Sequence, residues 1–142
     1  MELERKLAVA DTGFVVALLN LSDAYHKDAA RIYEQLSMPI LLPQTVLTEV
    51  AYLVGKVVGI QQVVQFLRYL PSSRFRLLAL QNQDLVRTAE ILAKYEDSRI
   101  DFVDASVMAV AERYQRCTVL TLDRRDFQLF RPQHCDFFEL LP

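Results

Sequence analysis

The sequence predicts a three-layer α/β/α sandwich with a mostly parallel central sheet. Short apolar runs, typical of buried strands, alternate along the chain with longer segments whose apolar residues recur at helical spacing. That alternation is typical of parallel sheets covered by helices on both faces. With only 3 Gly and 5 Pro in 142 residues, long flexible connections are not expected.

Five strands are predicted from short runs of apolar or β-branched residues. The first run, with the sequence LAVA, is followed directly by Asp11, and the fourth, TVLTL, is followed directly by Asp123. The third run is predicted from alternation of apolar and polar residues. The predicted strands are 6–10, 39–42, 75–80, 118–122 and 137–141.

Six helical segments are predicted between these strands. Ser22 or Asp23 can cap the second segment, and Asn82 or Asp84 can begin the fifth, while Gly59 and Pro71 mark ends. The predicted segments are 13–20, 22–36, 43–58, 60–70, 82–95 and 103–114.

Bulk composition indicates a single globular domain over residues 1–142. Hydrophobic residues make up 52% of the chain and the net charge is −2, which argues against disorder and against binding nucleic acid through bulk positive charge. We expect Cys117 and Cys135 to be reduced thiols, because two Cys and two scattered His are too few for a zinc site. No signal peptide or membrane span is predicted, so a cytoplasmic protein with no membrane contact is expected.

Several acidic side chains fall where an α/β sheet binds its ligands. Asp11 and Asp123 follow two predicted strands, and ligands bind beyond the carboxyl ends of strands, at the switch in strand order. Either residue alone is better explained as a turn or cap residue, but two at equivalent places on two strands favour a shared site. Glu49 lies at the edge of the apolar stripe of its helix, which fits a boundary residue or a carboxylate directed inward.

The segment RIDFVDASVMAVAERY places two carboxylates at the start of an apolar helix. Asp101 is well explained as an N-cap residue, which the helix dipole favours by about 0.3–1 kcal/mol. Asp104 falls on the apolar face, where burying an unpaired carboxylate costs several kcal/mol. We therefore expect a cation to face Asp104, and a divalent ion with oxygen ligands, Mg²⁺ or Mn²⁺, fits best.

Four segments together resemble the PIN domain family, and specifically its VapC-type toxin group. VADTGFVVALLNLSDAYH resembles the first strand and acid of that family, LTEVAYLV its second acidic motif, DFVDASVMAVAE its third, and TLDRRDF its fourth. The matching acids are Asp11, Glu49, Asp104 and Asp123. Asp101 is a further candidate metal ligand or only a cap, and Asp126 is a candidate ligand or only a cap of the next turn.

The resemblance implies a PIN-like fold, Mg²⁺ or Mn²⁺ held by the clustered acids, and endoribonuclease activity. Many members are toxins held inactive by an antitoxin protein, and many are homodimers. A metal there would activate a water for attack on an RNA phosphodiester. Thr12, Thr121, Arg124 and Arg125 are candidate RNA contacts, with Arg99 a weaker one, while His26 is expected to orient locally through Asp23.

Other interpretations of the acids fit less well. Asp11-Thr12-Gly13 also resembles the Asp-Thr-Gly of aspartic proteases, but those are all-β proteins. A receiver-like domain expects paired acids after its first strand and a Lys after its last core strand, and no Lys occurs beyond Lys94. The main alternative function is a catalytically silent PIN-like module that binds RNA or a protein.

Overall fold

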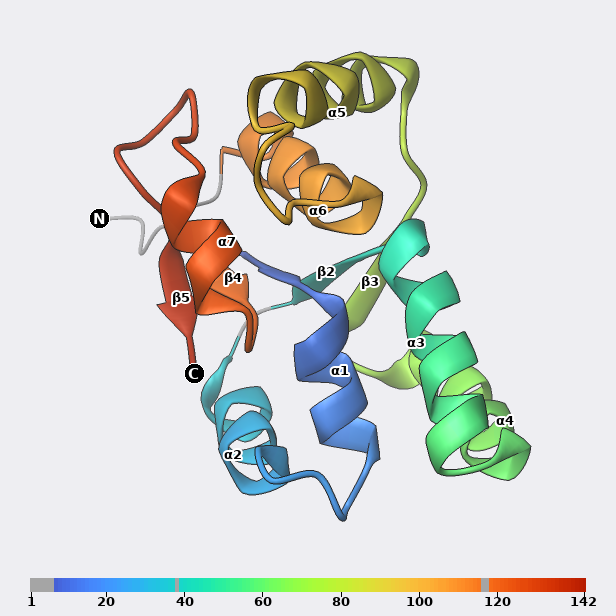
Figure 1. The fold of residues 1–142 in the computed structure, drawn as a ribbon. Coiled ribbons are helices and arrows are strands. Elements are labelled where there is room, and N and C mark those ends of the chain that lie inside the picture. The colour runs from blue at the N-terminus through green and yellow to red at the C-terminus, as the bar shows by residue number, and fades with distance from the viewer. Residues whose placement is uncertain (1–6, 38, 116–117) are drawn as a thin grey trace.

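The computed structural model describes residues 7–37, 39–115 and 118–142 (Figure 1). Its centre is one five-stranded sheet in the order β3-β2-β1-β4-β5, with every neighbouring pair parallel. The strands are β1 (Ala8–Ala10), β2 (Ile40–Pro43), β3 (Phe75–Leu78), β4 (Thr118–Leu120) and β5 (Glu139–Leu141). The predicted fold class is confirmed, and the sheet is wholly parallel.

Helices cover both sides of this sheet. In Figure 1, α5 and α6 lie above the strands, while α1 and α2 lie below them and α3 and α4 extend to the right. The helices are α1 (Thr12–Leu19), α2 (His26–Gln35), α3 (Gln44–Val57), α4 (Ile60–Tyr69), α5 (Asn82–Lys94), α6 (Phe102–Arg113) and α7 (Arg124–Leu129), with a short 3₁₀ turn, η1 (Leu70–Ser72).

Helix α6 packs against the strands and is almost entirely enclosed. Its residues 105–111 are all buried, and apart from Ser106 and Met108 they are Ala or Val. Helix α5 covers it from outside, and two ion pairs join the helices: Arg87 to Glu112 at 2.6 Å and Arg113 to Asp84 at 2.7 Å. Both ion pairs lie at the end of α6, whereas its start, which carries Asp101 and Asp104, is held by the buried residues that follow it.

Strand and helix ends differ from the sequence prediction in a few places. The strand predicted over 75–80 ends at Leu78, and the one predicted over 118–122 ends at Leu120. One further hydrogen bond, from Thr121 N to Leu141 O at 2.8 Å, prolongs the pairing of β4 with β5. The last strand begins at Glu139 and not at 137.

Helix α7 was not predicted, because six residues are too few to establish helical periodicity. Asp123 caps it, and Phe127 anchors it: the Phe127 side chain is fully buried, with its ring centroid 6.4 Å from that of Phe138. The prediction that Asp126 caps the turn after Arg125 is wrong, because Asp123 occupies the cap position and Asp126 lies inside the first helical turn.

The predicted beginning of the second helix is also wrong. Asp23 Oδ1 accepts a hydrogen bond from Tyr25 N at 2.9 Å, which closes a local turn, and α2 begins only at His26. The His26 ring does not reach the Asp23 side chain. Its Nδ1 lies 2.8 Å from the carbonyl oxygen of Ala17, so it links α2 to α1 instead.

Two residues used in the sequence interpretation, Lys6 and Cys117, lie outside the described residues. Within the described part of the chain, none of the helices has the length and apolar character needed to cross a bilayer.

Candidate functional site

The site lies where the strand order changes direction, between β1 and β4. From β1 the chain builds outward through β2 and β3, and it returns to place β4 and β5 on the other side. Asp11 follows β1 directly, and its backbone N–H donates a 2.8 Å hydrogen bond to the carbonyl of Leu120, the last residue of β4. This is the place where open parallel sheets bind their ligands.

A pocket of about 770 Å³ opens at this point, and the four predicted acids all line it. Asp11 comes from the end of β1, Glu49 from α3, Asp104 from α6 and Asp123 from the loop after β4. Asp23 adds a fifth carboxylate, and within residues 7–37, 39–115 and 118–142 no Lys or Arg lines the pocket. Its lining residues are Asp11, Thr12, Gly13, Val16, Asp23, Ala24, Tyr25, Glu49, Leu53, Asp104, Leu122 and Asp123.

Asp11 is buried and is held by its neighbours. Its Oδ2 accepts a 2.9 Å hydrogen bond from the hydroxyl of Thr121, and that hydroxyl oxygen in turn accepts the backbone N–H of Asp123 at 2.9 Å. Burial raises the pKa of Asp11 to about 6, with smaller contributions from the charges of Asp123 and Glu49, although the hydrogen bonds from Thr12 and Thr121 oppose this rise.

Asp104 and Asp101 form a reciprocal cap at the start of α6. Asp101 Oδ1 accepts the backbone N–H of Asp104 at 2.9 Å, and Asp104 Oδ2 accepts the backbone N–H of Asp101 at 3.1 Å. The expectation that Asp101 caps the helix is confirmed. Burial raises the pKa of Asp104 to about 8, and the nearby charges of Asp11 and Asp101 add to this rise.

Asp123 and Asp126 repeat the same three-residue spacing at the start of α7. Asp123 Oδ1 accepts the backbone N–H of Asp126 at 3.4 Å. One carboxyl oxygen from each of Asp104, Asp123 and Asp126 lies within 4.8 Å of the other two. Burial, followed by the hydrogen bond and charge of Asp123, raises the pKa of Asp126 above its usual range. Asp126 is thus the acid whose importance the sequence interpretation ranked too low.

Glu49 is half-buried on the pocket side of α3. One turn earlier, the Thr45 hydroxyl lies 2.8 Å from the Ser106 hydroxyl of α6. This side-chain contact holds the first turns of α3 against α6. It therefore helps to determine where Glu49 lies relative to the other acids.

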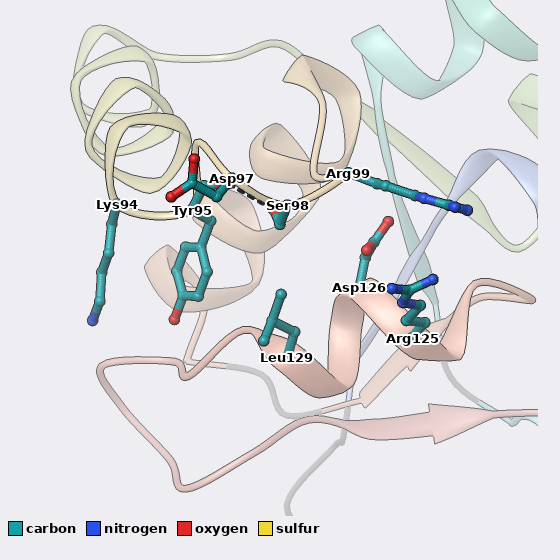
Figure 2. Close-up of a pocket in the computed structure, with 8 residues that line it drawn as sticks. All are labelled: Lys94, Tyr95, Asp97, Ser98, Arg99, Arg125, Asp126 and Leu129. Carbon is teal, nitrogen blue, oxygen red and sulfur yellow. Dashed lines mark hydrogen bonds between the residues drawn. The ribbon is translucent and has the colours of Figure 1, made fainter.

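The candidate RNA contacts differ in how buried they are and in whether they line the acidic pocket. Thr121 is fully buried, so a direct phosphate contact would require it to give up its hydrogen bond to Asp11. Thr12 lines the pocket. Arg124 is exposed and donates a hydrogen bond to the carbonyl of Pro142, away from the acids. Arg125 lines a neighbouring hollow together with Arg99 (Figure 2).

The residues present suit a hard divalent cation. The side chains of the acidic group offer only carboxylate oxygens, the donors that Mg²⁺ and Mn²⁺ prefer. The Thr12 hydroxyl, which lines the same pocket, is buried and finds no hydrogen-bond partner among the described residues. A buried hydroxyl without a partner is uncommon in folded proteins, and a cation or its bound water would satisfy it.

Comparison with known proteins places this fold and site in a family. Ribonuclease VapC26 of Mycobacterium tuberculosis is 29% identical over 134 residues, covering 94% of this chain and 99% of that protein. The crystal structure of VapC20 of the same organism, described as a sarcin-ricin loop cleaving toxin, superposes with a TM-score of 0.82 at 23% identity, covering 95% of this chain and 99% of that one.

VapBC2 of Rickettsia felis, solved bound to a DNA fragment from its promoter, superposes with a TM-score of 0.71 at 17% identity, covering 96% of this chain and 99% of that one. The family model for the PIN domain matches residues 8–131, which span all of the acids described above. The chain belongs to the PIN domain family.

Proposed function

We propose that this protein is a metal-dependent endoribonuclease that hydrolyses RNA phosphodiester bonds, and that it is the toxin of a type II toxin–antitoxin pair. The observation that carries the proposal is the convergence of carboxylates: Asp104, Asp123 and Asp126 lie within 4.8 Å of one another, and Asp11 and Glu49 line the same pocket as the first two. The names of its relatives, a ribonuclease and a toxin, support the same activity.

In this proposal Asp11, Glu49, Asp104 and Asp123 hold Mg²⁺ or Mn²⁺, with Asp126 as a further ligand. When bound, the ion would lower the pKa of a water and stabilise charge on the phosphate. The protein's own contribution is to position the acids. Thr121 orients Asp11, and the backbone hydrogen bonds at the starts of α6 and α7 orient Asp104 and Asp123.

The raised pKa values of Asp11 and Asp104 support a site built for a cation. A buried carboxyl group has a raised pKa when the protein supplies too few positive charges and hydrogen bonds to stabilise its ionised form. None of the described residues that line the pocket is Lys or Arg, so a cation from solution is the counter-charge that we propose. The arrangement gives no role to a side chain as nucleophile.

The test is RNA cleavage by purified, antitoxin-free protein with Mg²⁺ or Mn²⁺ and with EDTA. Asp104→Asn should reduce cleavage about a hundredfold or more, because loss of even an outer-shell partner of a metal site costs 10–100-fold. Asp28→Asn is the matched control, because Asp28 lies on α2 in an exposed pair with Arg31. Cleavage by Asp104→Asn at the parent rate would reject the metal assignment.

The alternative function, a silent module that binds RNA or a protein, has a different outcome in the same experiment. It predicts that Mg²⁺ or Mn²⁺ still raises the Tm of the parent protein, while no RNA is cleaved under any condition.

Partner proteins are part of the proposal. Structures similar to this chain include a toxin–antitoxin complex from Klebsiella pneumoniae, with a TM-score of 0.65. Exposed apolar side chains on α3 and α4 offer a contact surface for an antitoxin or a second copy: Tyr52, Val57, Ile60, Leu67 and Tyr69. Light scattering of the purified chain would test the proposed homodimer. We also propose that the protein acts in the cytoplasm, where its RNA substrate would be found.

A further inference from the structure

A second hollow, of about 440 Å³, adjoins the acidic site (Figure 2). It lies between the α5–α6 connection and α7. Figure 2 shows Asp126 between Arg99, which extends from the α5–α6 connection, and Arg125, which extends from α7. The hollow is lined by Lys94, Tyr95, Asp97, Ser98, Arg99, Arg125, Asp126 and Leu129.

The two hollows differ in charge. Among the described residues, the main pocket is lined by five carboxylates and by no Lys or Arg. The second hollow is lined by three cationic residues, Lys94, Arg99 and Arg125, and by two acidic ones, Asp97 and Asp126. If a nucleic-acid strand places one phosphate beside the acids, a neighbouring phosphate of the same strand can contact the cationic side chains of the second hollow. Most affinity for nucleic acids comes from such contacts between cations and phosphates.

Arg99 and Arg125 are available for a ligand. Within the part of the chain that the structure describes, the ion pairs closer than 4.0 Å involve Arg31, Arg87 and Arg113, and neither Arg99 nor Arg125 takes part in one. Both arginines are exposed. Both side chains line the same hollow as Asp126.

Asp126 joins the two hollows. Its carboxyl group belongs to the cluster with Asp104 and Asp123, and it also lines the cationic hollow. Asp126 is therefore common to the acidic cluster and the cationic hollow, so a phosphate bound in the hollow would lie close to the acids. The planar guanidinium forks of two arginines match the geometry of a phosphate better than lysine ammonium groups do.

We propose that the hollow between the α5–α6 connection and α7 is a phosphate-binding subsite, in which Arg99 and Arg125 hold the backbone phosphate of an RNA nucleotide adjacent to the bond that is cleaved. This inference rests on the proposed ribonuclease function and names part of its substrate contact. Because the two arginines bind backbone and not bases, they add affinity without sequence preference.

The test compares Arg99→Gln, Arg125→Gln and the double variant with the parent on a single-stranded, fluorescently labelled RNA. Arg68→Gln is the matched control, because Arg68 is an exposed residue of α4 with the same change in charge. Each single variant should raise KM about two- to fivefold, as expected for an exposed charge pair, while kcat stays within about twofold. Thermal unfolding would verify that each variant is folded.

Salt dependence gives a second readout. In a plot of log(kcat/KM) against log[KCl], each lost phosphate contact should reduce the slope by about 0.7, as found for single strands. Arg125→Lys keeps the charge and should keep most of the slope. A double variant with the parent's KM and slope would overturn the subsite, and so would a large fall in kcat at unchanged KM, because the arginines would then act on the reacting phosphate.

Failure of the subsite and failure of the proposed function can be told apart. If the parent cleaves RNA and the double variant is indistinguishable from it, only the subsite is wrong. If the parent cleaves no RNA, the proposed function is wrong, and fluorescence anisotropy with the same RNA then decides the subsite. Weaker binding of the double variant than of Arg68→Gln would support it, and equal binding would reject it.

Discussion

The hydroxyl of Thr121 donates a 2.9 Å hydrogen bond to Oδ2 of Asp11, although the two residues are 110 positions apart in the sequence. The same hydroxyl oxygen accepts the backbone N–H of Asp123. One buried side chain therefore fixes the relative positions of two pocket acids, one from the end of β1 and the other from the loop after β4. We therefore expect the threonine to act on the site through its hydrogen bond to Asp11.

Replacing Thr121 by Val should separate this positioning role from packing, because Val preserves the branched shape and removes the hydroxyl. Loss of a hydrogen bond to a charged, buried partner should lower the free energy of unfolding at pH 8 by about 1–3 kcal/mol, and the pKa of Asp11 should rise above 6. Chemical denaturation and the pH profile of RNA cleavage measure the two effects. Thr121→Ser, which keeps the hydroxyl, should behave like the parent; equal loss in both variants would indicate a packing defect only.

The metal-free protein should become less stable as pH rises. The folded state raises the pKa of Asp11 from 3.8 to about 6 and that of Asp104 to about 8, so the folded state binds more protons than the unfolded state between these values. The favourable contribution is complete below about pH 3.8 and is lost as pH passes 6 and then 8. For Asp11 alone the loss corresponds to about 3 kcal/mol.

Denaturation in EDTA at pH 5, 7 and 9 would measure this loss. Other carboxylates titrate in the same range, so the informative quantity is the difference between the parent and Asp104→Asn. The Asn variant cannot ionise and should gain stability relative to the parent as pH rises. A difference that does not vary with pH would contradict the raised pKa of Asp104.

Mg²⁺ or Mn²⁺ should reverse this trend. Carboxylates must lose their protons to bind a metal, so the affinity of the proposed site should rise with pH until about pH 8. The gain in Tm from a fixed metal concentration should therefore be larger at pH 8 than at pH 5.5. Differential scanning fluorimetry tests this, with Asp28→Asn as a control that should follow the parent. Equal gains at both pH values would place metal binding elsewhere.

Much of this architecture was predictable because local and global signals agree. A short apolar run such as LAVA at β1 favours a buried strand by its length, and the longer apolar face of α6 favours a helix. The alternation of the two kinds of segment predicts a parallel sheet. The acids at Asp11, Glu49, Asp104 and Asp123 could be nominated because each stands at a strand end or on an apolar helix face. Their common pocket follows from the strand order.

Other features had no local signal. The six residues of α7 depend on the cap at Asp123 and the buried ring of Phe127, and both depend on tertiary packing. The importance of Asp126 follows from that helix, since without it the residue resembles any acid in a polar turn. The hydrogen bond from His26 to Ala17 depends on how α2 returns against α1, which no spacing in the sequence encodes.

Glu112 should be a structural residue outside the site. It is nearly buried, accepts hydrogen bonds from Arg87 Nε at 2.6 Å and Nη2 at 3.2 Å, and also accepts the backbone N–H of Gln133 at 2.6 Å. Glu112→Gln removes the closer of the two charged partners of Arg87 and leaves it only the exposed Glu90 among the described residues. The free energy of unfolding should fall by about 2–4 kcal/mol, somewhat less than for a fully buried pair. The KM and kcat of the folded fraction should not change; a change in kcat would show that the α5–α6 contact controls the site.

Two substitutions of Asp101 distinguish helix capping from metal binding at the start of α6. Asp101→Asn keeps a good N-cap side chain and removes only the charge, whereas Asp101→Ala removes the cap, which is worth about 1 kcal/mol. If Asp101 is a cap only, Asp101→Asn should keep both the stability and the metal response of the parent, and Asp101→Ala should lose about 1 kcal/mol in denaturation. Asp104→Asn keeps an acceptor for the Asp101 N–H but should lose the metal response. A weakened metal response in Asp101→Asn at unchanged stability would make Asp101 a ligand as well as a cap.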